Sequence, residues 1–583
     1  RRSDAGPDER DDGHMGLITS ALQIGKSALM SYQSALLAVG NNVSNASSPE
    51  YTRQTPVLSP LMGGVTPEGF QAGAGVALVA LKRNIDEALE SRIRVGLGDQ
   101  SSAAVERQAL GRLETVLNEM TDQDLSTLLE KFFGAFSSLQ NAAHDVSARG
   151  MVITAGQSLV DEIRRQRTDV LSLVEELNQG ITDVTRQADG IARDIASLNQ
   201  QIVDAETRQR GMAGALRDQR DAKLRELSEI VRIQAEPQDT GAVNVYVGNE
   251  LLVQGGTCRG LTTETEIRDG IERVIPVFAD DDGPIRVLGG RLEGLAESRD
   301  TFSLGHLKDL DTLAAALIQE VNKVHSQGQG LCGLTDVTGT FSVFDADAVL
   351  NSDAAGLALR PKNGSFQITV RNTTTGTGVT TTIPVDLDGI GADTTLASLA
   401  VAINADTDNL SASVTADRRL RITADNGYEV TFGEDSSNVL AALGINTFFT
   451  GAAANDIALN PVVASDATLL AAARSNLPGD GTNADALARV GTAAAASLNG
   501  RSIVDFYNFV AGKIAVNGNA ARAGQQAADS ILTSLQAQRE SISGVSLDEE
   551  AIQLVKFERG FQGAARYVSV VNNLIDEMLG LLK

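Results

Sequence analysis

The residue types that usually carry chemistry are few and scattered in this chain. Its four histidines stand in unrelated contexts, and none belongs to a His-Glu-x-x-His pair that could hold zinc on one helix face. The two cysteines, Cys258 and Cys332, show no metal-ligand spacing, so we expect isolated thiols. Neither a Gly-x-Ser-x-Gly elbow nor a Walker loop occurs. The sequence therefore predicts no catalytic residue, no metal site and no cofactor.

Two weaker motifs are better explained as structure. Gly328, Gly330 and Gly333 match the Gly-x-Gly-x-x-Gly pattern of dinucleotide sites. They follow a predicted helix rather than a strand, and no clear helix begins after them, so a flexible stretch is expected there. Asp280 to Gly283 could contact a divalent cation, but this run lacks the spaced ligands and terminal Glu of a calcium loop. We expect a solvated turn at that point.

Length and charge exclude further classes of protein. A chain of 583 residues has room for roughly four domains, each with its own core. A net charge of −26 argues against nucleic acid or anionic lipid as the main partner, since both require basic surfaces. No stretch of the sequence is apolar for long enough to predict a transmembrane helix. A large structural protein without a nucleic-acid or membrane partner fits these limits.

The strongest pattern is a pair of heptad seams at the two ends of the chain. Each seam recurs with spacings of four and three, which places it on one face of a helix, as a coiled coil requires. On spacing alone, the two helices either pair with each other or pack separately against a globular core. The front seam is Ile18, Leu22, Gly25, Leu29, Tyr32, Leu36, Val39 and Val43, and the back seam is Phe557, Phe561, Ala564, Val568, Val571, Ile575, Met578 and Leu582.

The front helix is unusual because it carries almost no charge. Between Met15 and Pro49 the only charged side chain is Lys26, whereas a surface helix normally has a charged outer face. A membrane span would need about 20 mainly apolar residues, and polar residues interrupt this stretch throughout. A cleaved signal would need a longer apolar run than Ala35 to Val39, with a basic region before it. We therefore expect this helix to pack against other protein on several sides.

The residues after this helix resemble the N-terminal signature of bacterial flagellar axial proteins. That signature places Asn-Asn-Ile-Ala-Asn, a turn and Gly-Tyr after a leucine-rich helix, and the stretch from Asn41 to Gln54 is similar to it. Gly544 to Glu550, followed by the back seam, resembles the C-terminal signature of the same family. In one departure, Glu50 stands where the family usually has Gly, and Gly adopts a positive φ at lower cost than Glu.

Three motifs resemble, within this family, the member that joins hook to filament. They are Tyr51 to Gln54, Leu216 to Asp221 and Gly248 to Gly255. The resemblance implies a non-enzymatic structural protein that polymerises with copies of itself and contacts the hook protein and the next hook-associated or filament protein. It also implies an extracellular position, flagellar type III export without a cleaved signal, and an export chaperone that binds the C-terminal helix.

The resemblance also indicates which residues form the polymer interface. Asn41, Asn42 and Tyr51 are expected to fix the exit of the chain from the front helix. The full set of expected interface residues is Ile18, Leu22, Leu29, Tyr32, Leu36, Val39, Val43, Asn41, Asn42, Tyr51, Phe557, Phe561, Val568, Val571, Ile575, Met578 and Leu582.

The expected fold is α+β and multidomain. The N- and C-terminal helices pair as a coiled coil, the middle domain is mainly helical with some β structure, and a β-rich outer domain is inserted in it. Residues 1–14 are highly charged without an apolar pattern, which predicts a disordered leader or extension. The expected segments are 16–100 and 546–583 for the terminal domain, 101–335 and 461–545 for the middle domain, and 341–460 for the insert.

Several elements can be predicted inside these segments. A third seam, from Val174 to Ile202, predicts a water-facing helix, and Val243, Val245 and Val247 predict a strand. Asn426-Gly427 favours a tight hairpin between two short strands. Helices are expected at 304–325, 396–404, 464–475 and from about 490 to 541. The insert resembles a small module found in flagellins and their cap and junction relatives.

Two alternatives stay open. Another axial protein, of the hook or the distal rod, is the nearest, although the long helix and the motif from Leu216 to Asp221 favour the junction. The other is a flagellar scaffold whose insert binds a surface ligand or carries an enzyme activity. The insert contains neither His nor Cys and has one tyrosine, Tyr428, which argues against catalysis and leaves ligand binding open.

Overall fold

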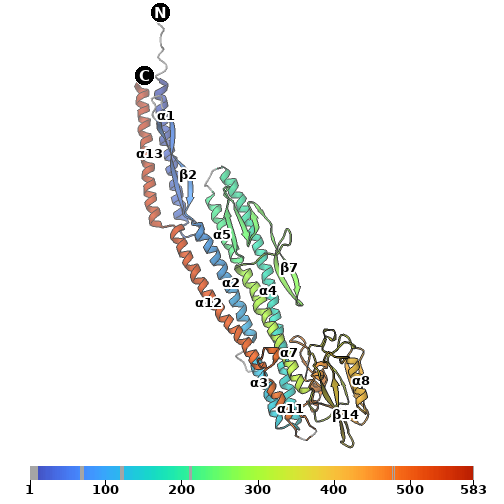
Figure 1. Ribbon diagram of the computed structural model, residues 1–583. Coiled ribbons are helices and arrows are strands. Elements are labelled where there is room, and N and C mark those ends of the chain that lie inside the picture. The colour runs from blue at the N-terminus through green and yellow to red at the C-terminus, as the bar shows by residue number, and fades with distance from the viewer. Residues whose placement is uncertain are drawn as a thin grey trace. The chain divides into compact units, whose positions relative to one another are not determined.

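The chain forms two compact units, each built from separate stretches of sequence. The computed structural model describes residues 11–65, 71–117, 124–208, 213–475, 477 and 479–581. The first unit lies within 1–107, 177–297 and 521–583, and the second within 108–176 and 298–520. Three long helices contribute residues to both units (Figure 1): α2 (Glu87–Leu117), α4 (Val146–Arg208) and α12 (Ile503–Ser543).

In the first unit the two ends of the chain lie side by side (Figure 1). Helix α1 (Asp11–Ser44) packs along α13 (Leu547–Leu581), and the antiparallel hairpin of β1 (Gln54–Val65) and β2 (Gln71–Arg83) packs on α1. A small core of Ala35, Val39 and Phe557 joins the two helices. This arrangement confirms the prediction that the terminal helices pair with each other.

The rest of the first unit is a helical layer that covers short strands. The second half of α4, together with α5 (Gly214–Ile230) and α6 (Gly290–Glu297), shares one core with the sheet β3-β4-β5-β6. Val243, Val245 and Val247 of β4 are buried in that core, as their alternation predicts. The strands are β3 (Ile233–Pro237), β4 (Val243–Val247), β5 (Glu250–Gln254), β6 (Thr257–Cys258) and the separate hairpin of β7 (Leu261–Arg268) and β8 (Ile271–Phe278).

The helical part of the second unit has an aromatic centre. Phe132 packs edge-on against Phe136, and both rings contact Phe448. Around them lie the first half of α4, the first half of α12 and several shorter elements. These are α3 (Leu125–Gln140), the π-helix η1 (Ser298–Ser303), α7 (Leu304–His325), β15 (Phe449–Thr450), β16 (Ala458–Leu459), α10 (Pro461–Ser465), η3 (Ala467–Leu469), α11 (Thr482–Val490) and η4 (Ala496–Leu498).

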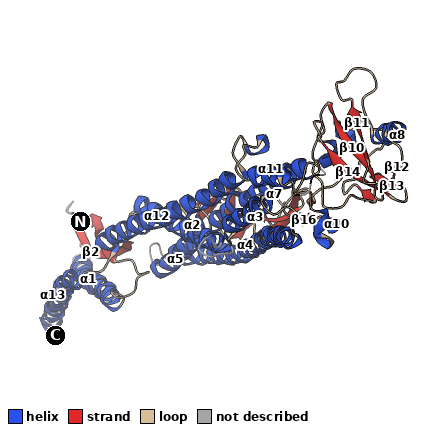
Figure 2. Ribbon diagram, turned by 90° about the horizontal axis from the view of Figure 1, so that it is seen from below, coloured by secondary structure: helices blue, strands red, loops and turns tan. Residues whose placement is uncertain are grey.

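The other part of the second unit is a β-rich module with a core of its own, whose buried residues run from Val337 to Ile445. Two three-stranded sheets, β11-β10-β14 and β12-β13-β9, enclose it together with α8, which Figure 2 shows beside the strands. The elements are β9 (Asp336–Thr338), η2 (Asp353–Ala355), β10 (Gly364–Asn372), β11 (Gly378–Val385), α8 (Leu396–Asp406), β12 (Leu410–Val414), β13 (Leu420–Ala424), β14 (Tyr428–Gly433) and α9 (Val439–Leu443).

The structure corrects several local predictions. The turn at Asn426-Gly427 makes no hairpin, because β13 pairs with β12 and β9 while β14 pairs with β10. The helix expected at 464–475 is only α10 and the short η3, because Asp466 caps a new turn through the backbone N–H of Thr468. The helix expected from about 490 to 541 is α12, which begins at Ile503 after the separate α11.

Two other segments also differ from expectation. The stretch from Gly328 to Gly333 is packed rather than flexible: Gln329 exchanges two backbone hydrogen bonds with Ala473, at 2.7 and 3.1 Å. A Cβ on Gly328 would lie 2.1 Å from the side chain of Asn483, so this position requires glycine. Residues 11–14 of the predicted leader belong to α1, and residues 1–10 lie outside the described residues.

Candidate functional site

The paired ends approach closely because each helix has a glycine where its partner needs space. A Cβ on Gly25 would lie 2.4 Å from Cγ2 of Val568, and one on Gly560 would lie 2.7 Å from the ring of Tyr32. Only glycine leaves room for these two side chains at the observed separation of the backbones. The front seam predicts Gly25, whereas Gly560 lies outside the back seam.

Most of the predicted seam residues lie in the contact between the two helices. Val39, Phe557, Ala564 and Val571 are buried, whereas Val43 and Met578 are 44% and 40% exposed. The side chain of Ile18 and the whole of Leu582 lie outside the described residues. The remaining predicted seam side chains are half-buried: Leu22, Leu29, Tyr32, Leu36, Phe561, Val568 and Ile575. These positions confirm the helix faces and leave the contact with neighbouring copies a prediction.

A buried polar cluster centred on Asn42 fixes the exit of the chain from α1. The Asn42 amide nitrogen donates to the backbone oxygen of Gln54 and to the Glu550 carboxylate, both at 2.9 Å. Its amide oxygen accepts from the Tyr51 hydroxyl at 2.7 Å and from the Gln54 N–H at 3.0 Å. Burial, with the charges of Asp218 and Glu550, raises the pKa of Tyr51 to about 12, so the hydroxyl stays a donor. Asn41 is exposed and takes no part.

The same cluster ties the start of α13 to the chain after α1. Arg53 donates from Nε to Glu550 at 2.8 Å and from Nη1 to Glu549 at 2.5 Å. Its backbone N–H donates to the oxygen of Ser543, at the end of α12, at 3.0 Å. Glu550 is almost fully buried, so its two oxygens gain these partners in place of water. The predicted exit residues Asn42 and Tyr51 are therefore linked to Glu550, which the sequence indicates only as part of the C-terminal signature.

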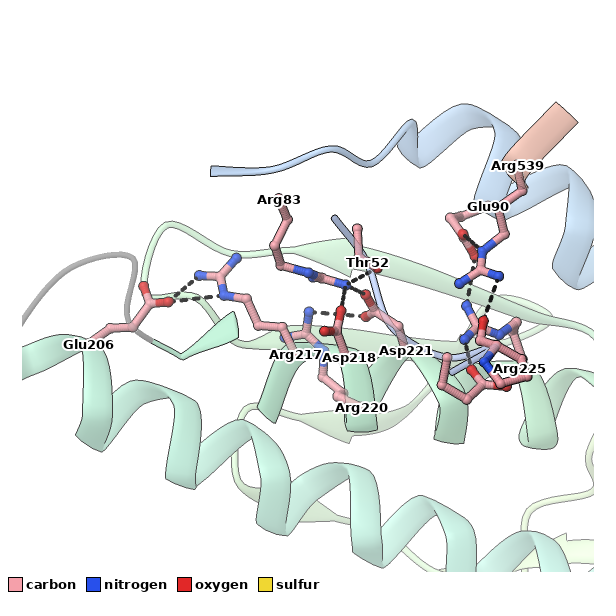
Figure 3. A network of polar contacts seen from close by, with 12 residues as sticks. Thr52, Arg83, Glu90, Glu206, Arg217, Asp218, Arg220, Asp221, Arg225 and Arg539 are labelled. Carbon is pink, nitrogen blue, oxygen red and sulfur yellow. Dashed lines mark hydrogen bonds and ion pairs between the residues drawn. The ribbon is translucent and has the colours of Figure 1, made fainter. Parts of the chain in front are cut away.

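A second polar cluster, drawn in Figure 3, joins the hairpin to helix α5. Arg83, the last residue of β2, forms ion pairs through Nη2 with Asp218 at 2.7 Å and Asp221 at 2.6 Å. Burial alone would lower the pKa of Arg83, but the two carboxylates outweigh burial and raise it. Asp218 and Asp221 belong to the motif from Leu216 to Asp221, so that motif supplies the carboxylates for this joint.

A third cluster surrounds Glu90, a buried residue of α2 (Figure 3). Its carboxylate accepts from Arg225 at 3.1 Å and from Arg539 at 2.8 Å. Arg539 also donates to the backbone oxygen of Pro49 at 3.0 Å, and Arg225 forms an ion pair with Glu50. Glu50 does not adopt a positive φ, so the residue that departs from the family pattern fits an ordinary turn.

We call these three clusters together the polar joint. It is centred on Glu550, Arg83 and Glu90, and it connects α1, the β1–β2 hairpin, α2, α5, α12 and α13 within the first unit. Its chemistry is structural: each buried carboxylate faces at least one guanidinium, which lowers the cost of burying both charges. The sequence motifs pointed to the acidic residues of α5, but no periodic signal marks Glu90, Arg225 or Arg539.

Apolar side chains remain exposed on the outer faces of the paired ends. Leu37 of α1 is 66% exposed and Ile552 of α13 is 67% exposed. Large exposed apolar surfaces on a soluble protein usually mark contacts with other protein. Of this set the sequence predicts only the seam residues Val43 and Met578, although spacings of three and four also relate many of the other members. The set is Met30, Leu37, Val43, Ile552, Leu554, Val555, Tyr567, Val570, Leu574 and Met578.

Comparison with known proteins gives these features a context. Residues 110–340 match the family described as the helical domain of flagellar hook-associated protein FlgK. Flagellar hook-associated protein 1 of Escherichia coli K12 is 25% identical over 97% of this chain and 100% of its own length. The chain is therefore similar to flagellar hook-associated protein 1 over nearly its full length. Its Bacillus subtilis relative of the same name is 24% identical, over 96% of this chain and 97% of its own.

A solved relative shows the fold of this family. The structure titled as the flagellar hook junction protein FlgK from Burkholderia pseudomallei covers 78% of this chain and 100% of its own, with 15% identity and a TM-score of 0.51. These similarities confirm the resemblance that the terminal signatures indicated. Among the described residues, no helix is long and apolar enough to cross a membrane.

Proposed function

We propose that this protein is a structural subunit of the bacterial flagellum that joins hook to filament. Copies of the chain polymerise through the outer faces of their paired ends, outside the cell, and contact the hook protein on one side and the next hook-associated or filament protein on the other. Similarity to flagellar hook-associated protein 1 supports this function and agrees with the expectation that the chain is not an enzyme.

The observation that carries the proposal is the exposed apolar set on α1 and α13. Most of the seam residues are used within the chain, so they hold the two helices together and give the pair a defined face. The exposed residues of that face have no partner of their own kind in the isolated chain, and burying each fully would contribute about 1.5–3 kcal/mol. Neighbouring copies can cover them. The seam therefore builds the interface, and the exposed set contacts the neighbour.

The polar joint fixes the orientation of the paired terminal helices within the first unit. Through buried carboxylates, Arg53 connects the chain after α1 to the start of α13, Arg83 connects the hairpin to α5, and Arg539 connects α12 to α2. A mechanical force on α1 and α13 is then transmitted to the rest of the first unit through these ion pairs as well as through the backbone. A junction between two unlike tubes needs such a connection, because its subunits must hold one orientation.

Helix α13 also offers a surface to an export chaperone before assembly. The family resemblance implies such a partner, and Val570, Leu574 and Tyr567 form an exposed apolar row on the last part of the helix. A chaperone that covers this row would keep copies apart until export. The same residues would then serve the chaperone first and the neighbouring subunit afterwards.

The test is to place charges on the exposed set and leave the seam intact. The variant Val570→Glu with Leu574→Glu should fold like the parent chain and fail to assemble, so that cells make hooks without filaments. Ile267→Glu with Val379→Glu is the matched control, because both side chains are at least 70% exposed and lie on the strands β7 and β11. Electron microscopy with a labelled chain should place the parent between hook and filament. Normal junctions in the charged variant, or label along the whole hook or in the rod, would contradict the proposal.

A further inference from the structure

A basic pocket lies in the first unit beside the polar joint. Its volume is about 310 Å³, and it opens between α2, the end of β2, α5 and the strands β3 and β4. Five basic residues line it, against three acidic ones, in a chain whose net charge is −26. The basic residues are Lys82, Arg83, Arg94, Arg217 and Arg220. A positive pocket on so acidic a protein requires an explanation of its own.

Most of the charged groups in the pocket already have partners. Arg217 pairs with Glu206 at 2.8 Å, and Arg83 pairs with Asp221 at 2.6 Å. Arg220 donates to the backbone oxygen of Gly241 at 2.8 Å. The carboxylates of Glu206 and Asp221 are therefore occupied.

The side chains of three charged lining residues, Lys82, Glu87 and Arg94, form no hydrogen bond or ion pair with a described residue. Lys82 and Glu87 are exposed to water, whereas Arg94 is only 8% exposed. Glu90, one turn earlier on α2, is occupied by Arg225 and Arg539. Burial lowers the pKa of Arg94, yet an arginine side chain stays charged in proteins. The charges of Glu87, Glu90 and Asp221 act on the largely buried Arg94 from a distance, and its donors have no acceptor among the described residues.

Two neighbouring guanidinium groups have spare donors as well. The Nε–H groups of Arg83 and Arg220 are buried without a hydrogen-bond partner among the described residues. Leaving a buried donor unpaired costs about 1–3 kcal/mol, and more when the group is charged. A pocket with such donors is stabilised when an anion enters it, and arginine forks fit the paired oxygens of carboxylate and phosphate groups.

We propose that this pocket binds one oxyanion group, a phosphate or a carboxylate, with Arg94 as its main ligand. The pocket volume of about 310 Å³ leaves space for such a group together with ordered water. The group can come from a free anion or from an acidic side chain of a second copy, since this chain carries 75 aspartates and glutamates. The site stands on the contacts of the first unit and does not depend on the proposed function.

The experiment is calorimetric titration of the full chain with sodium phosphate and, separately, with sodium acetate, at constant ionic strength. The parent should show saturable binding of phosphate, and Arg94→Gln should weaken it by about tenfold or more, as expected for one lost charge-assisted contact. Arg94→Lys keeps the charge but loses the fork, so it should retain part of the affinity. Arg232→Gln is the matched control, because Arg232 is half-exposed, pairs with Asp99 at 2.7 Å and does not line the pocket.

The two titrants distinguish a free anion from an acidic side chain of a second copy as the source of the oxyanion group. Binding of phosphate alone would assign the site to a free phosphate-type anion, whereas binding of both would show that a carboxylate of a second copy also fits. Thermal unfolding by circular dichroism must show that the Arg94→Gln and Arg94→Lys chains are folded. No saturable binding of either titrant to the parent, or equal binding by the parent and Arg94→Gln, would overturn the proposal.

Discussion

Replacing His306 with leucine should make the second unit more resistant to mild acid. This histidine of α7 is buried, and neither ring nitrogen has a hydrogen-bond partner among the described residues. Burial, reinforced by the charge of Lys513 and opposed by that of Asp309, lowers its pKa from 6.5 to about 4. The folded chain therefore holds the neutral ring in the range where the unfolded chain takes up a proton.

The size of the effect follows from these two pKa values. Because the unfolded state binds the proton more tightly, the contribution of neutral His306 to stability is fully present above pH 6.5 and is lost as the pH falls toward 4. Between about pH 7.5 and about pH 5, a single group of this kind removes about 2 kcal/mol of unfolding free energy. His306→Leu should abolish this contribution, and at neutral pH it should cost little, because it removes a buried polar ring without partners.

Urea unfolding followed by far-UV circular dichroism at both pH values measures the change. The informative quantity is the loss of stability in the parent minus the loss in the variant, since all other titrating groups are common to both. His325→Leu gives a contrast: His325 accepts from the Ala471 N–H at 3.1 Å and contacts the Asn446 oxygen at 2.8 Å, so its loss should destabilise the chain even at neutral pH. An acid sensitivity of His306→Leu equal to that of the parent would refute the reasoning.

Two further predictions concern the first unit. Gly25→Val should separate α1 from α13, because even a Cβ at Gly25 would lie 2.4 Å from Val568. Hydrogen exchange should then show a loss of protection in α1. The control Gly40→Val should keep this protection, because Gly40 has open space around it. Glu90→Ala should cost about 3–5 kcal/mol of unfolding free energy, because it leaves Arg225 and Arg539 without their shared carboxylate. The control for the second is the exposed Glu558→Ala, and urea midpoints that shift equally in both variants would show that the Glu90 ion pairs contribute nothing.

The sequence predicts elements whose signals are local. The helix predicted from Leu304 to His325 has those bounds in α7, and the one from Leu396 appears as α8, since the apolar spacing lies within each segment and Thr395 caps the start of α8. The terminal seams are also local, and two matching seams made their pairing a reasonable hypothesis. These signals depend only on residues a few positions apart.

What the sequence could not predict depends on pairings between distant residues. The strands around Asn426-Gly427 were found, but each has its partners elsewhere, with Arg421 opposite Thr338 and Tyr428 opposite Asn372. The polar joint is similar, since Glu90 meets Arg539 across 449 positions. No spacing rule relates such residues. Most of the exposed apolar set was missed for a different reason: the positions that stay exposed can be recognised only once the partner helix is in place.

The hydrogen bond between Asn42 and Glu550 also bears on when the terminal pair can form. The two residues are 508 positions apart, so almost the whole chain must be available before the contact can close. Long loops add little to the final free energy, but contacts of such separation form slowly. The surface that neighbouring copies would use is therefore the last to be completed in each chain. A delay of this kind limits premature self-association. Until the 35-residue helix α13 has docked on α1, the surface that would contact another copy is incomplete.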